Sequence, residues 1–419
     1  MNTYRSLKES DKAAYDALKG EMKREEQGLE LIASENTVSP AVLDALGSVF
    51  TNKYSEGYPG KRYYGGQEFT DIIETLAIDR VKELFGAEHA NVQPLSGASA
   101  NLAAYAALLA PGDTVLGMDL SHGGHLTHGH PVTLPAKVYR FVRYKTEADG
   151  TIDYDKLEAL AEAERPKLML AGFSSYTRQL DYERFTAIAK KVGAISMMDM
   201  AHIAGMIAGK ALPNPVPHFD IVTATTHKTL RGPRGGLILC KEPFAKAIDK
   251  AVFPGVQGGP HMHMVLAKAV AFGEALLPEF RVYARQILDN AKVLEAEFVS
   301  LGYEIVFGKT ENHMLLIDTV KSRNVTGKEA EAWLDIAGIT VNKNVLPDDP
   351  RGPLDPSGIR IGVPAVTTRG MKEGEMRQIA GWIDRALRSD GKKRALGAIR
   401  KEVKTLCKSF PIYSKREVL

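Results

Sequence analysis

Short apolar runs alternate with longer stretches of helical pattern through the middle of the chain, and this alternation does most to narrow the choice of fold. The runs lie at residues 90–93, 114–118, 138–141, 168–171, 194–198, 221–223 and 236–240. Strands that alternate with helices are typical of βα units and a mostly parallel sheet. The sequence therefore predicts an α/β fold.

The chain has 419 residues, which is too long for one simple core and indicates two domains. Residues 1–45 are polar with a helical pattern, and residues 52–66 form a loop rich in Tyr, Gly and Pro. A helix at 262–277 is followed by a long helix from about residue 281 to 301, where the character of the chain changes. We expect an N-terminal helical segment (1–45), a large domain (46–278) and a small C-terminal α/β domain (279–419).

The composition, 44% hydrophobic and 25% charged, is that of an ordinary soluble globular protein. No apolar run approaches the roughly 18 residues that a membrane helix needs, and the N-terminus lacks the apolar region of a signal peptide. Two cysteines, Cys240 and Cys407, provide neither a disulfide framework nor a metal cluster. We expect a cytoplasmic protein with no membrane contact.

The net charge of +3 is unevenly distributed: residues 392–419 carry nine Lys or Arg and two Glu, or +7, which leaves −4 for the rest. A basic tail can contact nucleic acid. However, apolar residues recur there at three- and four-residue steps, as in an amphipathic helix packed on a domain: Leu396, Ile399, Val403, Leu406 and Phe410. Aromatic residues do not alternate with the basic ones as in a single-strand binding surface. We therefore expect packing rather than nucleic-acid binding.

Asp199 closes the apolar run 195–198, and Lys228 follows a later run at 221–223. An acid that ends one buried strand and a lysine that follows another are the pair that a pyridoxal phosphate (PLP) enzyme needs. The lysine forms a Schiff base with the cofactor, and the carboxylate keeps the pyridine nitrogen protonated so that the ring accepts electrons. A lysine in a Gly-rich loop is usually solvated, but its pairing with Asp199 favours the cofactor interpretation.

The segment 93–99 closes one predicted strand and opens a helix. Small residues there allow backbone N–H groups and the positive end of the helix to meet a phosphate. Ser-Gly turns are also common N-caps, so the signal gains weight from its position before Asp199 and Lys228. We expect the cofactor phosphate to be bound by Ser96, Gly97, Ala98 and Ser99.

Four histidines lie between residues 122 and 130, and together with Asp119 they could form a metal site. The loop lacks the one-turn spacing of a helical His pair, and no Cys is nearby. A His that stacks on a cofactor ring fits this pattern better. We expect no metal.

Arg360 lies in the run 358–362, which is typical of a strand of the small domain. A guanidinium group binds a carboxylate through two parallel hydrogen bonds, which a lysine cannot imitate. Arg360 could be an ordinary surface arginine, but the flanking glycines and apolar residues favour a partly buried one that holds a substrate α-carboxylate.

Together these segments resemble the serine hydroxymethyltransferase (glycine hydroxymethyltransferase) family through nearly the whole chain. The matching runs are 31–36, 52–54, 56–66, 122–129, 199–202, 226–229, 253–255, 257–260, 342–344, 358–360 and 369–370. Several of these runs are long and specific. The resemblance implies the fold of type I PLP-dependent transferases, which is aspartate aminotransferase-like, with a smaller C-terminal domain.

The resemblance also implies roles for particular residues. Lys228 forms the Schiff base, Asp199 pairs with the pyridine nitrogen, and His125 stacks on the ring. Further cofactor contacts are Ser174, His202, Thr225 and His227, with Tyr54, Gly258 and Gly259 from a partner subunit. Substrate contacts are Ser34 and Arg360, with Glu56 and Tyr64 from the partner. Folate contacts are Tyr63, Leu120, Leu126 and Asn344. The implied assembly is a homodimer with shared active sites, with a tetramer left open.

The implied reaction is the reversible transfer of the hydroxymethyl carbon of serine to tetrahydrofolate, which gives glycine and 5,10-methylenetetrahydrofolate. The expected catalytic residues are Lys228, Glu56, Tyr64, His125, Asp199 and His202. Among them, Glu56 is our choice for the acid–base group near the serine hydroxyl, because a carboxyl in a closed, aromatic-lined interface can carry a proton.

Three positions depart from the usual family pattern: Ala98 replaces a Ser, Ala224 a Thr, and Leu95 an aromatic residue or His. The hydroxyl missing at Ala98 corresponds to about one hydrogen bond to the phosphate, on the order of 1 kcal/mol, which backbone donors could offset. Alternative functions on the same fold are a folate-independent aldolase acting on β-hydroxy amino acids and an α-methylserine hydroxymethyltransferase. From another class, a PLP-dependent scaffold or RNA-binding protein could use the basic tail. Retained Tyr63, Leu126 and Asn344 favour folate.

Overall fold

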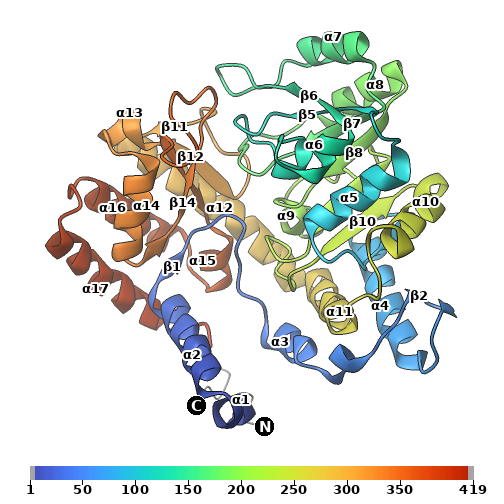
Figure 1. The fold of residues 1–419 in the computed structure, drawn as a ribbon. Helices are drawn as coiled ribbons and strands as arrows, with labels where there is room; N and C mark the ends of the chain where they lie inside the picture. The colour runs from blue at the N-terminus through green and yellow to red at the C-terminus, as the bar shows by residue number, and fades with distance from the viewer. Residues whose placement is uncertain (1–4, 414–419) are drawn as a thin grey trace. The chain divides into compact units, whose positions relative to one another are not determined.

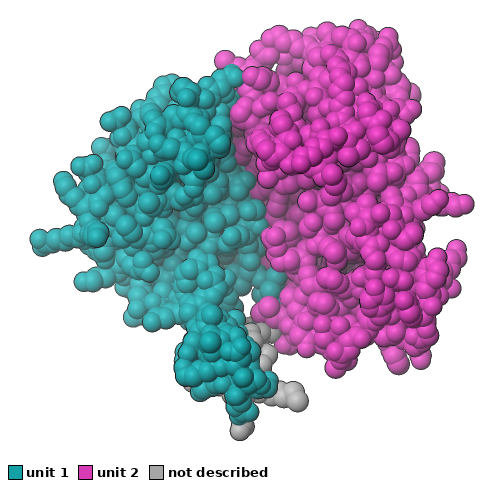
Figure 2. All heavy atoms as spheres, viewed as in Figure 1, with its two compact units in different colours: residues 1–40, 289–306, 313–419 teal, residues 41–288, 307–312 magenta. Residues whose placement is uncertain are grey.

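The computed structural model describes residues 5–413 and has an α/β fold, as predicted (Figure 1). Two compact units can be distinguished (Figure 2). We call residues 41–288 and 307–312 the central unit, and residues 1–40, 289–306 and 313–419 the C-terminal unit. The three-part division expected from the sequence, with boundaries after residues 45 and 278, remains a prediction.

The central unit is built around a seven-stranded sheet of order β4-β10-β9-β8-β7-β5-β6. Its strands are β4 (His89–Asn91), β5 (Thr114–Met118), β6 (Arg140–Tyr144), β7 (Leu168–Gly172), β8 (Ile195–Asp199), β9 (Ile221–Thr225) and β10 (Gly236–Cys240). Strand β10 is antiparallel to both of its neighbours, and the other pairs are parallel. The prediction of a mostly parallel sheet is confirmed.

One of the predicted strands, 138–141, is misplaced. Residues Leu134–Val138 form the short helix α6, with Pro135 in its first turn, where a proline is tolerated. Strand β6 therefore begins only at Arg140. It lies at the edge of the sheet and is partly exposed, so it lacks the continuous apolar run of the inner strands.

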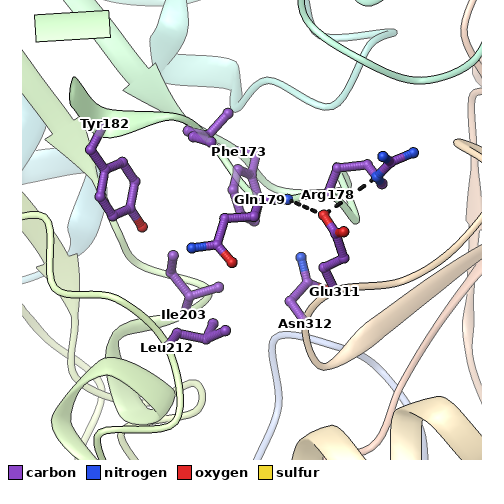
Figure 3. Close-up of a pocket in the computed structure, with 9 residues that line it drawn as sticks. Phe173, Arg178, Gln179, Tyr182, Ile203, Leu212, Glu311 and Asn312 are labelled. Atoms are coloured by element: carbon purple, nitrogen blue, oxygen red, sulfur yellow. Dashed lines mark hydrogen bonds and ion pairs between the residues drawn. The ribbon is translucent and has the colours of Figure 1, made fainter. Parts of the chain in front are cut away.

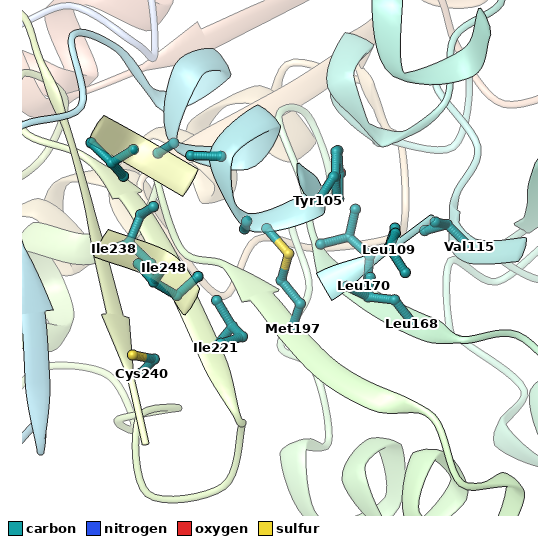
Figure 4. Packing of buried hydrophobic residues seen from close by; sticks show 14 of the residues in the cluster. Tyr105, Leu109, Val115, Leu168, Leu170, Met197, Ile221, Ile238, Cys240 and Ile248 are labelled. Carbon is teal, nitrogen blue, oxygen red and sulfur yellow. The ribbon is translucent and has the colours of Figure 1, made fainter. Parts of the chain in front are cut away.

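Helix α5 (Gly97–Leu108) packs on one face of the sheet (Figure 4). Its small residues Ala100, Ala103 and Ala104 let the helix approach the strands closely. The strand residues in this core are Val115, Leu168, Leu170, Met197, Ile221 and Ile238. Leu168 and Leu170 are two residues apart and therefore point to the same face. This packing fixes both ends of α5 against the sheet.

The central unit contains further helices and one short hairpin. The helices are α4 (Glu68–Phe85), α7 (Tyr154–Glu164), α8 (Tyr182–Val192), α9 (Ala204–Ala208), α10 (Ala245–Lys250) and α11 (Met262–Leu276), and α3 (Pro40–Leu46) lies at the boundary of the unit. The hairpin of β2 (Gly57–Tyr58) and β3 (Lys61–Arg62) lies within the predicted loop at 52–66.

The C-terminal unit has an antiparallel sheet of order β11-β12-β15-β14. Its strands are β11 (Glu304–Ile305), β12 (Met314–Asp318), β14 (Asn342–Asn344) and β15 (Gly358–Gly362). Its helices include α1 (Arg5–Ser10), α2 (Lys12–Gln27), α13 (Thr319–Arg323), α14 (Gly327–Ile336), α15 (Pro364–Thr368), α16 (Glu373–Leu387) and α17 (Lys393–Ser409). Helix α12 (Pro278–Ser300) belongs partly to each unit.

The sequence suggested that the N-terminal segment is helical throughout, but this is wrong. Gly28 ends α2, and β1 (Leu29–Glu30) pairs in parallel with β13 (Ile339–Thr340). Alternate residues Leu29, Leu31 and Ala33 are fully buried, which is a strand pattern too short to recognise beside a long polar helix.

The amphipathic helix predicted near the C-terminus is confirmed as α17, which buries Leu396, Ile399 and Val403. Lys415 and Arg416 of the basic tail lie outside the described residues. Within residues 5–413, no helix is long and apolar enough to cross a membrane.

We expect Leu170→Ala to lower the free energy of unfolding by about 2–5 kcal/mol, because it leaves a cavity in the core that Leu170 shares with Leu168 and Met197. Urea denaturation followed by circular dichroism measures this. Val282→Ala, at a site that is 71% exposed, is the control and should change little. Equal effects of both substitutions would contradict the described core.

Candidate active site

Asp199 and Lys228 lie at the same edge of the central sheet. Asp199 is the last residue of β8 and pairs in register with Thr223 of the neighbouring parallel strand β9, which Lys228 follows by a short turn. Both side chains are buried, with 7% and 8% of their residue surface exposed. Ligands of open α/β sheets bind at this carboxyl edge. The sequence prediction of an acid and a lysine at neighbouring strand ends agrees with this arrangement.

The turn that carries Lys228 is tied to the segment that carries His202. The Thr229 hydroxyl donates to the His202 carbonyl at 2.9 Å and accepts from the Gly205 N–H at 2.9 Å. Thr225, just before the turn, donates to the Ala201 carbonyl at 3.3 Å. The loops after β8 and β9 are therefore held together, and they carry the expected residues Asp199, His202, Thr225, His227 and Lys228.

The Asp199 carboxylate accepts three hydrogen bonds. Asn101 Nδ2 lies 2.9 Å and His128 Nε2 lies 3.2 Å from Oδ2, and the Ala201 N–H lies 3.0 Å from Oδ1. Burial opposes ionisation, but the hydrogen bonds from His128 and Asn101 outweigh it and hold the pKa of Asp199 well below its usual range. Asp199 is therefore an anion, as required to keep a basic ring nitrogen protonated.

The histidine-rich loop places His125 beside this carboxylate network. His125 caps the short helix η2 (Leu126–His128), and its Nδ1 accepts from the Thr127 N–H at 3.2 Å. Ligand atoms of His125, His128 and Asp199 lie within 4.8 Å of one another, but the hydrogen bonds already account for this proximity. Asp119, which the sequence suggested as a further metal ligand, instead accepts from the N–H and hydroxyl of Ser121.

The expected phosphate loop forms the N-terminus of α5. Ser96 and Ser99 cap each other: Ser96 Oγ accepts from the Ser99 N–H at 3.1 Å, and Ser99 Oγ accepts from the Ser96 N–H at 2.8 Å. A side chain at Gly97 would place its Cβ 2.7 Å from Thr225 Cγ2, so only glycine fits there. First-turn N–H groups have no acceptor within the helix and suit an anion.

Lys268 supports this loop, a role that was not predicted from the sequence. Its fully buried amino group on α11 donates to the carbonyls of Val92, Pro94 and Gly236 at 2.6, 2.9 and 2.9 Å, and burial lowers the pKa of Lys268 to about 7. Lys268 therefore connects the segment after β4 to the start of β10. A lysine within the apolar pattern of 262–276 is the sequence signal, because a buried polar group needs hydrogen-bond partners.

A second group of expected residues is exposed. The rings of Tyr54 and Tyr64 meet edge to face at 5.4 Å, and the two residues are 56% and 50% exposed. The negative charge of Glu56 raises the pKa of Tyr54. Gly258 and Gly259 lie beside Glu56 and Tyr54, respectively. Among the expected folate residues, Tyr63 is 74%, Leu120 38% and Leu126 46% exposed.

A buried arginine fixes the backbone on both sides of Glu56. Arg62 Nη1 donates to the carbonyls of Ser55 and Gly57, each at 3.0 Å. Its remaining nitrogens bind the carboxylates of Asp71 and Glu74, at 2.8 and 2.5 Å. The side chain of Arg62 is 3% exposed. This anchor, also missed from the sequence, restricts the position of the Glu56 carboxyl.

In the C-terminal unit, Arg360 lies on β15, as predicted. Its Nε donates to Asn342 Oδ1 at 3.0 Å, and burial lowers the pKa of Arg360 to about 10, so it remains a cation at neutral pH. The Gly362 N–H donates to the Leu31 carbonyl at 2.7 Å. The segment that leads to Ser34 therefore packs on the same strand. Asn344 follows on β14, which pairs with β15.

The other expected residues at the sheet edge differ in their surroundings. Burial, with the charges of Arg234 and Lys228, lowers the pKa of His227 to about 3, so His227 is neutral. Ser174 follows β7, and its N–H donates to the Gly123 carbonyl of the histidine-rich loop at 2.6 Å. Three segments, after β5, β7 and β8, thus meet near Asp199.

A small, mostly apolar cavity flanks this edge (Figure 3). Phe173 and Ile203 line it, and each precedes or follows an expected cofactor residue in the chain. Arg178 and the Gln179 N–H both bind the Glu311 carboxylate, at 3.4 and 2.8 Å (Figure 3). The lining contains none of the expected catalytic residues, so the cavity lies beside the candidate site.

The parts described fit PLP: a buried lysine, an anionic carboxylate at the adjacent strand end, a half-buried imidazole, and a capped helix N-terminus for a phosphate. This fold and site define a PLP-dependent transferase of fold type I. The family model of serine hydroxymethyltransferase matches residues 7–383, and the chain belongs to this family. PLP is accordingly its cofactor and tetrahydrofolate its cosubstrate.

Three relatives illustrate the similarity. The serine hydroxymethyltransferase of Acidobacterium capsulatum is 58% identical over 409 residues, 97% of this chain and 96% of the relative. That of Koribacter versatilis is 57% identical over 412 residues, 98% of this chain and 96% of the relative. Serine hydroxymethyltransferase 2 of Pseudomonas fluorescens is 54% identical over 405 residues, 96% and 97% of the two chains.

We expect Gly97→Ala to weaken PLP binding at least tenfold, about 1.4 kcal/mol, because the new Cβ must displace Thr225 or the phosphate loop. Fluorescence titration of the cofactor-free protein with PLP measures the dissociation constant. Gly381→Ala, a helical glycine with open space around it, should leave the constant unchanged. An unchanged constant for Gly97→Ala would contradict the phosphate site.

Proposed function

We propose that the residues at this sheet edge perform the reaction of the family, the reversible transfer of the hydroxymethyl carbon of serine to tetrahydrofolate. The products of this transfer are glycine and 5,10-methylenetetrahydrofolate. The assignment of this reaction rests on 58% identity to a serine hydroxymethyltransferase over 97% of the chain. In the structure, its main support is the buried, ionised Asp199 beside the strand that leads to Lys228.

The cofactor is held by residues of the central unit. Lys228 binds it covalently, and Asp199 keeps a proton on its ring nitrogen. Ser96, Gly97, Ala98 and Ser99 bind the phosphate, His125 stacks on the ring, and Ser174, His202, Thr225 and His227 complete the contacts. When bound, PLP supplies an electron sink for the charge left at the substrate α-carbon.

The substrate carboxylate is bound by Arg360 and Ser34. Asn342 Oδ1 accepts from Arg360 Nε, and a guanidinium group can bind a carboxylate through two parallel hydrogen bonds. Arg360 remains charged because its lowered pKa, about 10, is still well above neutral pH. Serine and glycine each have an α-carboxylate, so Arg360 and Ser34 can bind both.

The exposed residues near Tyr54 and Glu56 act in the active site of a neighbouring subunit. Helix α4 presents Phe69, Ile72 and Leu76 to solvent at three- and four-residue spacing, 65%, 56% and 37% exposed. Such an apolar stripe is typical of a surface covered by another subunit, and we propose a second copy of this chain as the subunit. Tyr54, Gly258 and Gly259 would then contact the phosphate in the partner, and Glu56 and Tyr64 its substrate.

Glu56 is the proposed acid–base group for the serine hydroxyl, with its backbone fixed by Arg62. We propose that the folate is bound by Tyr63, Leu120, Leu126 and Asn344.

We also propose a cytoplasmic location, which is supported by the two buried, free cysteines, Cys240 and Cys407.

The reaction is tested by visible absorbance of the purified protein with glycine, before and after tetrahydrofolate is added. We expect a yellow protein whose red-shifted band rises sharply only when both ligands are present, because Asp199 and the ring stabilise the charge on glycine. A yellow protein without a folate-dependent change would support the aldolase instead. A colourless protein would contradict PLP binding.

Sharing of active sites is tested by mixing two inactive variants, Lys228→Ala and Glu56→Gln, under conditions that exchange subunits. If Glu56 acts in the partner, each mixed dimer has one intact site, and an equal mixture regains about one quarter of wild-type activity. If Glu56 acts beside Lys228 of its own chain, every site carries one lesion and no activity returns.

A further inference from the structure

We propose that Asn101 is a positioning residue of the active site, which determines where the protons lie on His125 and Asp199 through one set of hydrogen bonds. The proposal rests on the roles of those two residues in cofactor binding given above.

The Asn101 side chain is fully buried on α5 and uses each of its polar atoms. Nδ2 donates to Asp199 Oδ2 and to Thr127 Oγ1, both at 2.9 Å, and Oδ1 accepts from Thr223 Oγ1 at 2.6 Å. These partners lie on β8, η2 and β9. One amide therefore connects the segments that carry Asp199, His125 and Lys228.

The charge on Asp199 fixes the orientation of this amide. An ionised carboxylate can only accept, so the NH₂ group of Asn101 must face it. The amide oxygen then faces Thr223, whose hydroxyl donates. The second N–H of the amide is directed to Thr127 Oγ1, which accepts it.

Thr127 transmits this orientation to His125. Its hydroxyl has one proton, and since Oγ1 accepts from Asn101, that proton is free to be donated to His125 Nδ1, 2.8 Å away. The Thr127 N–H also donates to Nδ1, at 3.2 Å. A nitrogen that accepts two hydrogen bonds carries no proton, so the ring proton of His125 lies on Nε2.

His128 is oriented in the same way from the other side. The backbone N–H of His125 donates to the ring nitrogen Nδ1 of His128 at 3.2 Å. The ring proton of His128 therefore lies on Nε2 and is donated to Asp199 Oδ2. Asp199 therefore receives two side-chain donors at one oxygen. The directions of all these bonds are mutually consistent.

The chemical consequence concerns charge at the cofactor ring. A PLP ring protonated by way of Asp199 carries a positive charge at its nitrogen. An imidazolium stacked on that ring would place a second positive charge against it, whereas the neutral Nε2–H form of His125 does not. Asn101 thus favours an anion at Asp199 and a neutral ring at His125.

The test uses Asn101→Asp, which keeps the shape but adds a carboxylate beside Asp199 and removes both donors. The readouts are the ¹⁵N resonances of His125, with and without PLP, and the PLP dissociation constant. We expect wild-type His125 to carry its proton on Nε2 only. In Asn101→Asp we expect Nδ1 to become protonated and PLP to bind at least tenfold more weakly.

The matched control is Asn290→Asp, because Asn290 is also a fully buried amide, which donates to Thr367 Oγ1 and to the Met371 carbonyl at 2.9 and 3.0 Å in the C-terminal unit. It should leave both readouts at wild-type values. An unchanged His125 in Asn101→Asp, or equal changes in the control, would overturn the proposal.

A second pair of variants applies even if Asn101→Asp does not fold. Thr127→Val removes only the hydroxyl that faces Nδ1, whereas Thr127→Ser retains it. We expect the His125 resonances to shift in Thr127→Val and to stay unchanged in Thr127→Ser, and identical spectra would overturn the proposal. Because the resonances are also read without PLP, a protein that binds no PLP would contradict the proposed function separately.

Discussion

The charge of Asp199 is the constraint on which the active site depends. An isolated carboxylate removed from water would take up a proton, because burial disfavours its ionised form. Asp199 remains an anion because Asn101, His128 and the Ala201 N–H donate to it at 2.9, 3.2 and 3.0 Å. Two of these donors come from α5 and η2, so the packing of these segments on the sheet determines the chemistry available at the strand end.

The same packing forms the expected phosphate loop. Asn101 lies four residues after Gly97 on α5, which packs against β9 and β10. Gly97 approaches Thr225 on β9, and Lys268 holds the backbone that enters the loop. A substitution that shifts α5 would therefore disturb the carboxylate and the phosphate loop together. Affinity for the cofactor and the ability to stabilise charge have one structural origin.

Much of this could be predicted from the sequence, because buried parallel strands are read from apolar runs and motif residues from their position after those runs. Strands 114–118 and 236–240 have the predicted bounds. The edge strand β6 was misplaced because an edge strand need not be apolar, and β1 was missed because two residues give no period. Asn101, Lys268 and Arg62 were missed because their roles depend on partners far along the chain. A polar residue within an apolar helix is the available signal, and it does not identify the partner.

We propose that Lys228, beside the ionised Asp199, carries the cofactor. The most direct measurement is reduction of the purified protein with borohydride, which makes the bond between a lysine and PLP permanent, followed by mass spectrometry of its peptides. We expect the added cofactor mass on the peptide that contains Lys228. The same mass on another lysine, or no added mass in protein supplied with PLP, would contradict it.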